Sequence, residues 1–184
     1  TCALPILTCT DVTFIAGSSN PTTSTSASLI NIEALSSPSV VPTAGIGFVR
    51  CSFFNLSYAI KINDSNISDI VFDSCLFSNL YTGIKLGELT AIDPRPTGIR
   101  ISNSVFDLIY SSAISTFEST TGVYSIGNRF KDVGNARLGS GNAAAPVIIF
   151  RDEECYSIGD QFDRDSTDAL DYPLDRKSTR LNSS

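Results

Sequence analysis

The chain of 184 residues has no histidine, no methionine and no tryptophan, and its five cysteines lack any CxxC spacing. Without histidine, this segment holds neither a Ser-His-Asp nor a Cys-His nucleophilic centre. A zinc site built from cysteine and histidine is excluded for the same reason. We therefore expect no metal ligands and no resident cofactor, and any catalysis here would have to use carboxyl groups.

Charge and long apolar runs are also scarce. The 13 lysine and arginine residues are mostly scattered singly through a chain of net charge −6, which argues against binding to a nucleic-acid backbone. No apolar run approaches the ~20 residues of a membrane-spanning helix. Residues 1–30 lack the features of a signal peptide and the chain has no initiator methionine, so we expect Thr1 to be a cut into a longer protein. Neither a nucleic-acid partner nor a membrane span is predicted.

The abundant residues are those of strands and turns. Ser, Thr, Asn, Ile, Val and Phe are frequent, and 42% of the residues are hydrophobic. These types favour β-strands and tight turns over helices, and the length suits one domain with a substantial core. The composition therefore predicts a single all-β domain.

An internal repeat defines the architecture. Residues 46–62 and 70–86 align without a gap at an offset of 24, and such self-similarity is typical of solenoids. The matched pairs are Ile46/Ile70, Phe48/Phe72, Cys51/Cys75, Phe53/Phe77, Asn55/Asn79, Leu56/Leu80, Ile60/Ile84 and Lys61/Lys85. Residues 99–114 repeat the pattern, and Tyr124–Phe130 and Tyr156–Phe162 are nearly the same heptapeptide. With 12–14 and 29–32 upstream, the sequence predicts about six coils, some of them incomplete.

Alternating apolar residues within each coil predict three short strands, separated by Asn, Ser, Asp and Gly. Equivalent strands of successive coils would lie parallel and about 4.8 Å apart. One column of inward side chains should then be a stack of rings: Phe53, Phe77, Phe106, Phe130 and Phe162. Two positions earlier, a buried file of small or polar residues should bond along the stack: Cys51, Cys75, Ser104, Asn128 and Asp160.

These coils, with their Ile-x-Phe, Cys-x-Phe-x-Asn and Ile-Lys-Ile segments, resemble the right-handed parallel β-helix repeats of pectate-lyase-like proteins and bacteriophage tailspikes. The resemblance covers roughly residues 10–165 and is one of repeat architecture. The rival fold, an antiparallel β-sandwich, predicts hairpins with Asn-Gly or Asp-Gly turns, and the chain contains neither pair. A right-handed parallel β-helix is therefore the predicted fold class.

The predicted β-helix segment spans residues 1–171, with loops rich in Ser, Thr, Pro, Gly and Ala inserted between strands. The insertions lie near residues 16–28, 36–44, 87–97 and 134–146, and they are either binding loops or solvated spacers. Residues 172–184 fall outside the repeat. Their end, from Asp175, resembles translated sequencing-adaptor read-through, with a natural disordered tail as the alternative.

Carboxyl groups are the candidate catalytic residues. Asp69 and Asp73 flank the strand of Ile70–Phe72, and three acids follow residues 147–150: Asp152, Glu153 and Glu154. A pair of carboxyl groups can hydrolyse a glycoside. Polysaccharide elimination would use a calcium site with a basic residue, so calcium is expected only if the chain is a lyase. Acids beside turns more often bond the backbone or water, and we favour that interpretation.

Five further residues are candidate ligand-binding groups. Lys61 and Lys85 should stack on an outer face, where they could bind an acidic sugar or simply deter edge pairing. Tyr58, Tyr81 and Tyr110 follow the second strand of their coils and could stack sugar rings, although packing at the corner is favoured. Cys51 and Cys75 should be close enough for a disulfide, but buried free thiols are the expected state.

The resemblance and the lack of a catalytic signature together predict a non-catalytic structural or receptor-recognition segment of a viral tail fibre or tailspike-like protein. Its partner would be a polysaccharide or cell-surface glycan and its location the virion or the extracellular space. A homotrimer is implied by the tailspike resemblance alone. The alternative is an extracellular polysaccharide lyase or glycoside hydrolase of the β-helix class.

Overall fold

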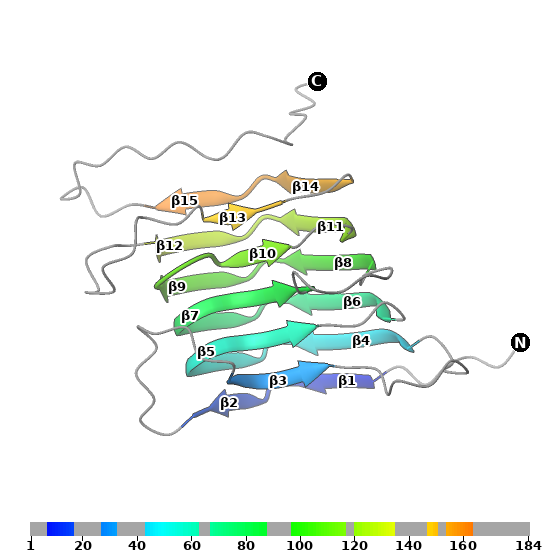
Figure 1. Ribbon diagram of the computed structural model, residues 1–184, viewed down its shortest axis with the longest axis horizontal. Coiled ribbons are helices and arrows are strands. Elements are labelled where there is room, and N and C mark those ends of the chain that lie inside the picture. Colours follow the sequence, from blue (N-terminus) through cyan, green and yellow to red (C-terminus); the bar gives the residue numbers. More distant parts are fainter. Residues whose placement is uncertain are drawn as a thin grey trace, which may run out of the picture.

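The structure is a computed structural model, and it describes residues 7–16, 27–32, 43–62, 67–87, 97–116, 120–134, 147–150 and 154–163. All regular structure in this part of the chain is β, in fifteen strands that form two sheets (Figure 1). The first sheet contains β1 (Leu7–Thr10), β4 (Thr43–Val49), β6 (Ile67–Asp73), β8 (Thr97–Ser102), β11 (Thr121–Ile126) and β14 (Cys155–Ile158). The second contains β2 (Thr13–Ile15), β3 (Ser28–Ile32), β5 (Ser52–Ile62), β7 (Leu76–Leu86), β9 (Val105–Ile109), β10 (Ile114–Thr116), β12 (Arg129–Val133), β13 (Ile148–Ile149) and β15 (Gln161–Asp163).

The strands of both sheets pair in parallel, and neighbours in a sheet come from successive passages of the chain. Each of six passages adds one strand to the first sheet and then one or two to the second. The passages lie one above another in Figure 1, from β1–β3 at the bottom to β14 and β15 at the top. The predicted all-β fold with parallel strands is confirmed.

Two passages differ from the predicted three short strands. β5 and β7 each run for eleven residues, because their second and third segments are continuous through a bend. The bends fall at Asn55 and Asn79, whose φ angles are 64° and 54°. Asparagine tolerates this left-handed conformation, and the Asn79 side-chain amide donates to Asn55 Oδ1 at 2.7 Å. In the fourth and fifth passages the two segments are separate strands, as predicted.

The predicted column of phenylalanine rings is confirmed. Successive rings from Phe53 to Phe162 stack with centroids 4.5–5.1 Å apart and interplanar angles of 15° or less. Phe14 extends the column by one ring, 5.0 Å from Phe53. The four rings from Phe53 to Phe130 are buried, whereas Phe162, in the last passage, is 41% exposed. The column therefore runs through all six passages and forms the centre of the core.

The predicted file of small and polar residues is also confirmed, and it closes the turns between the two sheets. The backbone N–H of Cys75 donates to Ser104 Oγ at 3.0 Å, and that of Ser104 donates to Asn128 Oδ1 at 2.9 Å. The N–H of Asn128 donates in turn to Asp160 Oδ1 at 2.7 Å. Each side chain thus satisfies a buried backbone donor of the passage before it, which removes the cost of leaving that donor unpaired.

The predicted insertions and tail fall largely outside the described residues. Residues 17–26, 33–42, 88–96 and 135–146 contain most of the four insertions, and residues 164–184 contain the tail. Their roles as binding loops, spacers or foreign sequence stay predictions.

Candidate functional site

Asp69 and Asp73 both lie in β6, on either side of Ile70–Phe72, but their surroundings differ. Asp69 is exposed and has a φ of 55°, at a position where neighbouring passages carry Gly45 and Gly98. Ser68 donates to its carboxylate at 3.2 Å. The Gly98 α-carbon lies beside the Asp69 carboxylate, so close that a Cβ there would be 3.1 Å from Oδ1. This is the behaviour of a turn acid that bonds its local surroundings.

Asp73 is half-buried and accepts three hydrogen bonds. Ser102 Oγ donates to Oδ1 at 2.7 Å, Asn103 Nδ2 donates to the same oxygen at 3.0 Å, and Ser74 Oγ donates to Oδ2 at 3.2 Å. The bond from Ser102 is the main cause that lowers the pKa of Asp73, against burial, which raises it. Asn103, Ser74 and the charge of Arg100 lower it further. Asp73 is therefore held in the ionised form, and a general acid needs the opposite shift.

The other three candidate acids form no described group. Asp152 and Glu153 lie outside the described residues, and Glu154 is exposed with a φ of 58° at the start of β14. Within the described ranges, no three Cys, Asp or Glu side chains gather in a way that could hold a metal ion. The carboxylate and calcium predictions are therefore untested by the structure.

The lysine candidates do stack. Lys61 and Lys85 are register partners of β5 and β7, flanked in the same column by Asn31 and Ser115. Lys85 Nζ lies 5.3 Å from the centre of the Tyr58 ring, a cation–π contact between two candidate residues. Tyr58 is only 9% exposed, so the Lys85 contact and burial leave little of its ring for a ligand.

The three tyrosine candidates do not share one column. Tyr58 pairs with Thr82, one residue beyond Tyr81. Tyr110 donates its backbone N–H to the Leu80 oxygen at 2.9 Å, which places it one residue past Leu80, as Tyr81 is. Since neighbouring residues in a strand face opposite sides, a slip of one position separates Tyr58 from the other two.

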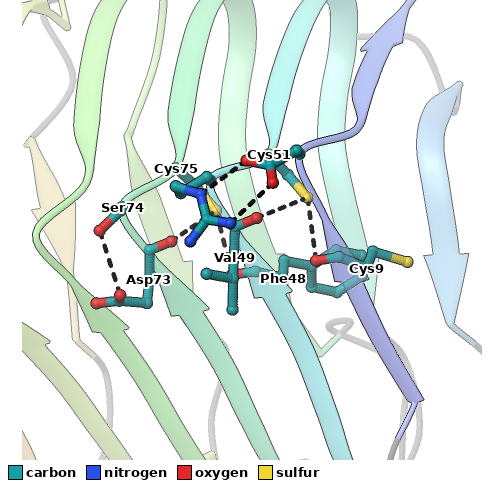
Figure 2. A network of polar contacts seen from close by, with 9 residues as sticks. Cys9, Phe48, Val49, Cys51, Asp73, Ser74 and Cys75 are labelled. Atoms are coloured by element: carbon teal, nitrogen blue, oxygen red, sulfur yellow. Dashed lines mark hydrogen bonds and ion pairs between the residues drawn. The ribbon is translucent and has the colours of Figure 1, made fainter.

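The two cysteines of the repeat, Cys51 and Cys75, are structural. Both are free thiols, and Figure 2 shows them bonded to backbone oxygens of neighbouring strands. Cys51 Sγ lies 3.3 Å from the Cys9 oxygen, and Cys75 Sγ lies 3.3 Å from the Phe48 oxygen. Burial raises the pKa of Cys75 to about 11. Because the thiolate is the reactive form, Cys75 is a packing group with a weak hydrogen bond and not a nucleophile.

A pair of tyrosines on the outer face of the first sheet is the best-formed candidate for ligand binding. Tyr124 of β11 and Tyr156 of β14 are register partners, and their rings stack 5.6 Å apart at an angle of 16°. The residues on either side of Tyr124, Val123 and Ser125, are fully buried, so the Tyr124 side chain points to the outside. Tyr156 is 39% exposed, although its ring is held by its partner. The pair is a preformed aromatic surface.

Other side chains extend this surface in two directions. Arg100 is exposed and is the register partner of Tyr124 on β8. Ile126 and Ile158 form the next outward column, two residues along, and Ile158 is 56% exposed. We name Arg100, Tyr124, Tyr156, Ile126 and Ile158 the tyrosine face. It combines two stacked rings, two aliphatic side chains and one guanidinium, which together suit a ligand with apolar C–H faces and a carboxylate.

Sequence reasoning missed the tyrosine face although the signal was present. Tyr124 and Tyr156 each begin the repeated heptapeptide, so their stacking followed from the same offset that aligned Phe130 with Phe162. The sequence prediction used the inward positions of this heptapeptide and only one outward column, that of Lys61 and Lys85.

Comparison of the chain with protein-family models, with curated proteins and with solved structures found no match. In the described part of the chain, no helix is long and apolar enough to cross a membrane. The geometry of the site is therefore the basis on which a function can be proposed.

Proposed function

We propose that this chain is a segment of a right-handed parallel β-helix in a viral tail fibre or tailspike-like protein, and that it recognises a cell-surface glycan without cleaving it. The virion or the extracellular space is its proposed location. The fold part of the proposal is supported by six stacked passages of parallel strands. The tailspike part, including a homotrimer, comes only from the resemblance of the repeats.

The single observation that carries glycan recognition is the stacked Tyr124–Tyr156 pair. Aromatic rings bind the C–H faces of sugars by the same burial and dispersion that pack them in cores, and a ring held by its neighbour loses little freedom on binding. Arg100, next to Tyr124, can form a two-pronged hydrogen bond with a carboxylate. An acidic oligosaccharide is therefore the proposed ligand class.

Asp73 does not suit one of the two roles that cleavage needs. Glycoside hydrolysis pairs a carboxyl that keeps its proton near neutral pH with an ionised one, and the hydrogen bonds to Asp73 lower its pKa, so the general acid would have to be another residue. Polysaccharide lyase or hydrolase activity stays the alternative prediction. Assays for new reducing ends and for unsaturated products, with Asp69→Ala and Asp152→Ala compared with the parent, test it directly.

The binding test uses a glycan array with uronic-acid and neutral oligosaccharides, followed by titration of any acidic hit. Tyr156→Ala should weaken binding about tenfold, which corresponds to about 1.4 kcal/mol and to the loss of one stacking surface. Tyr156→Phe keeps the ring and should bind nearly as well. Arg100→Gln should reduce the preference for acidic over neutral sugars.

Several results would contradict the proposal. Equal binding by Tyr156→Ala and the parent would show that the tyrosine face is not the site. A loss of binding in Lys61→Gln or Tyr81→Ala, with the tyrosine face intact, would move the site to the second sheet. Product formation that depends on Asp69 or Asp152 would replace recognition with catalysis.

A further inference from the structure

The tyrosine face contains one charged side chain, Arg100. Among the six described strands of the first sheet, β8 alone contains a lysine or an arginine. Arg50, which follows β4, is already engaged, because its guanidinium donates to both carboxylate oxygens of Asp11, at 2.7 and 2.8 Å. Arg100 is exposed and lies beside Tyr124 in the register. The tyrosine face therefore offers a ligand a single cationic group.

A carboxylate lies next to this cation. In the pairing of β6 with β8, Arg100 is opposite Val71, and Asp73 is two residues further along β6. The α-carbons of Asp73 and Arg100 are therefore diagonal neighbours, about 8 Å apart, within reach of a long side chain. The charge of Arg100 helps to lower the pKa of Asp73, as an opposite charge at this range does. Asp73 thus shares the field of Arg100 with any carboxylate that a ligand brings.

The Asp73 carboxylate is also held in place. It accepts hydrogen bonds from Ser102 at 2.7 Å and Asn103 at 3.0 Å on the next passage, and from Ser74 at 3.2 Å. Figure 2 shows the bond from Ser74. Three donors around one carboxylate favour its ionised form and fix its orientation. Asp73 cannot swing away from a second anion without losing these bonds.

The neighbours of Arg100 on the next passage disfavour a second anion as well. The face of an aromatic ring carries partial negative charge, so the Tyr124 ring attracts C–H groups and repels a carboxylate. Ile126, the next outward residue of β11, is half-buried and offers no hydrogen bond to replace the water that a carboxylate would lose. On both sides of Arg100, the surroundings therefore suit an uncharged sugar.

We propose that Asp73 is a specificity-determining residue of the tyrosine face, which restricts the ligand to an oligosaccharide with one carboxylate at Arg100 and neutral sugars on either side. This inference rests on the proposed function and narrows its ligand class. A chain with a carboxylate on every sugar would bring a second anion towards Asp73 or over the Tyr124 ring. Like charges placed side by side reject a wrong ligand more than they weaken the right one.

Titration of the full chain with two tetrasaccharides tests the proposal. One contains a single glucuronic acid among neutral sugars, and the other consists entirely of uronic acids. At low salt the parent should bind the first about three- to tenfold more tightly, the size of a partly screened repulsion between charges several ångströms apart. Asp73→Asn keeps an oxygen for Ser102 and Asn103, and it should remove most of this preference by strengthening binding of the polyuronate. Asp107→Asn removes the same charge from β9 of the second sheet and should keep the preference of the parent.

Salt dependence and a second variant separate repulsion from a structural role. Raising the salt concentration should reduce the preference of the parent and change that of Asp73→Asn little, because salt screens the repulsion. A purely structural role of Asp73 would weaken both ligands alike at every salt concentration. Val71→Lys adds a cation beside Arg100 and leaves the Asp73 hydrogen bonds in place, so it should also favour the polyuronate. Far-UV circular dichroism confirms that each variant is folded.

The possible failures are distinguishable. Equal binding of both tetrasaccharides by the parent would overturn the role of Asp73, while glycan recognition would stand. So would a preference that persists in folded Asp73→Asn or, if that variant does not fold, in Val71→Lys. An Asp107→Asn effect as large as that of Asp73→Asn would assign the preference to net charge. Binding of neither ligand would overturn the proposed acidic-glycan recognition and this inference with it.

Discussion

Replacing Phe77 with alanine tests whether the ring column holds the fold together. Phe77 is fully buried, stacks on Phe53 at 4.9 Å and on Phe106 at 4.5 Å, and meets Phe72 edge-on at 6.2 Å. Truncation of a buried phenylalanine costs about 3–5 kcal/mol, and each ring pair adds about 0.5–1.5 kcal/mol beyond area burial. Because the ring has neighbours on both sides, we expect Phe77→Ala to lie near the upper limit, about 4–5 kcal/mol.

The same change at the end of the column gives the comparison. Phe162 is 41% exposed and has one ring neighbour, Phe130 at 5.1 Å. Phe162→Ala should therefore cost only about 1–2 kcal/mol, since part of its apolar surface is in water before the change. Leu108→Ala, at an exposed site away from the column, should change the free energy of unfolding by less than about 0.5 kcal/mol.

Urea unfolding followed by far-UV circular dichroism measures these differences in a chain without tryptophan. Phe77→Leu should recover part of the loss, because it restores apolar volume without the stacked ring. A loss of about 4–5 kcal/mol in Phe77→Ala would be a large part of the unfolding free energy of a typical domain, about 5–15 kcal/mol. Equal losses for Phe77→Ala and Phe162→Ala would refute the argument, because position in the column would then not matter.

Three further predictions concern single side chains. Because folding lowers the pKa of Asp73, ionisation of its carboxyl stabilises the protein above the ordinary carboxyl pKa, and this stabilisation is lost as pH falls through the lowered pKa. Urea unfolding at a series of pH values from neutral to acid should therefore show a smaller loss of unfolding free energy in Asp73→Asn than in the parent. Burial raises the pKa of Cys75 to about 11, so a thiol reagent at pH 8 should modify it only after urea unfolding, and stability should decline as pH rises from about 9 to 11. Gly83→Ala would place a Cβ 2.5 Å from the Ala113 backbone oxygen and 2.9 Å from the Phe106 ring, and it should cost about 1–3 kcal/mol in thermal unfolding. Gly47→Ala, with nothing nearer than 3.5 Å, should be neutral or slightly stabilising.

Much of the core could be predicted because a parallel stack turns sequence offset into spatial contact. The offset of 24 aligned Phe53 with Phe77, and the register repeats that alignment residue by residue. The polar file was predictable for the same reason, since Ser104 and Asn128 occupy one position of the repeat. The direction of their bonds, from backbone to the next side chain, depends on turn geometry that the repeat alone does not specify.

The site was less predictable, and the reason is the face on which each residue falls. Tyr58 and Tyr81 were grouped by their closeness to a core leucine, although the same alignment pairs Tyr58 with Thr82. A difference of one position moves a side chain to the other face of a strand, so closeness along the chain was the wrong guide. Tyr124 and Tyr156 share a position in the repeat, and they do stack.

Substitutions in the inward columns should therefore affect stability, and substitutions in the outward columns should affect binding, largely independently of one another. The ring column and the polar file fix the register of every passage, whereas Tyr156 contributes one ring contact on a face that is partly in water. Changing the tyrosine face should alter binding while costing little stability, and changing Phe77 should do the reverse until the protein unfolds. A solenoid that holds its register from the inside can vary its outer columns without losing the strand spacing, about 4.8 Å, that sets neighbouring side chains side by side. If variants of the tyrosine face lost binding only in proportion to their loss of stability, the Tyr124 and Tyr156 rings would have a structural role and would not contact the ligand. The ligand would then have to bind another face.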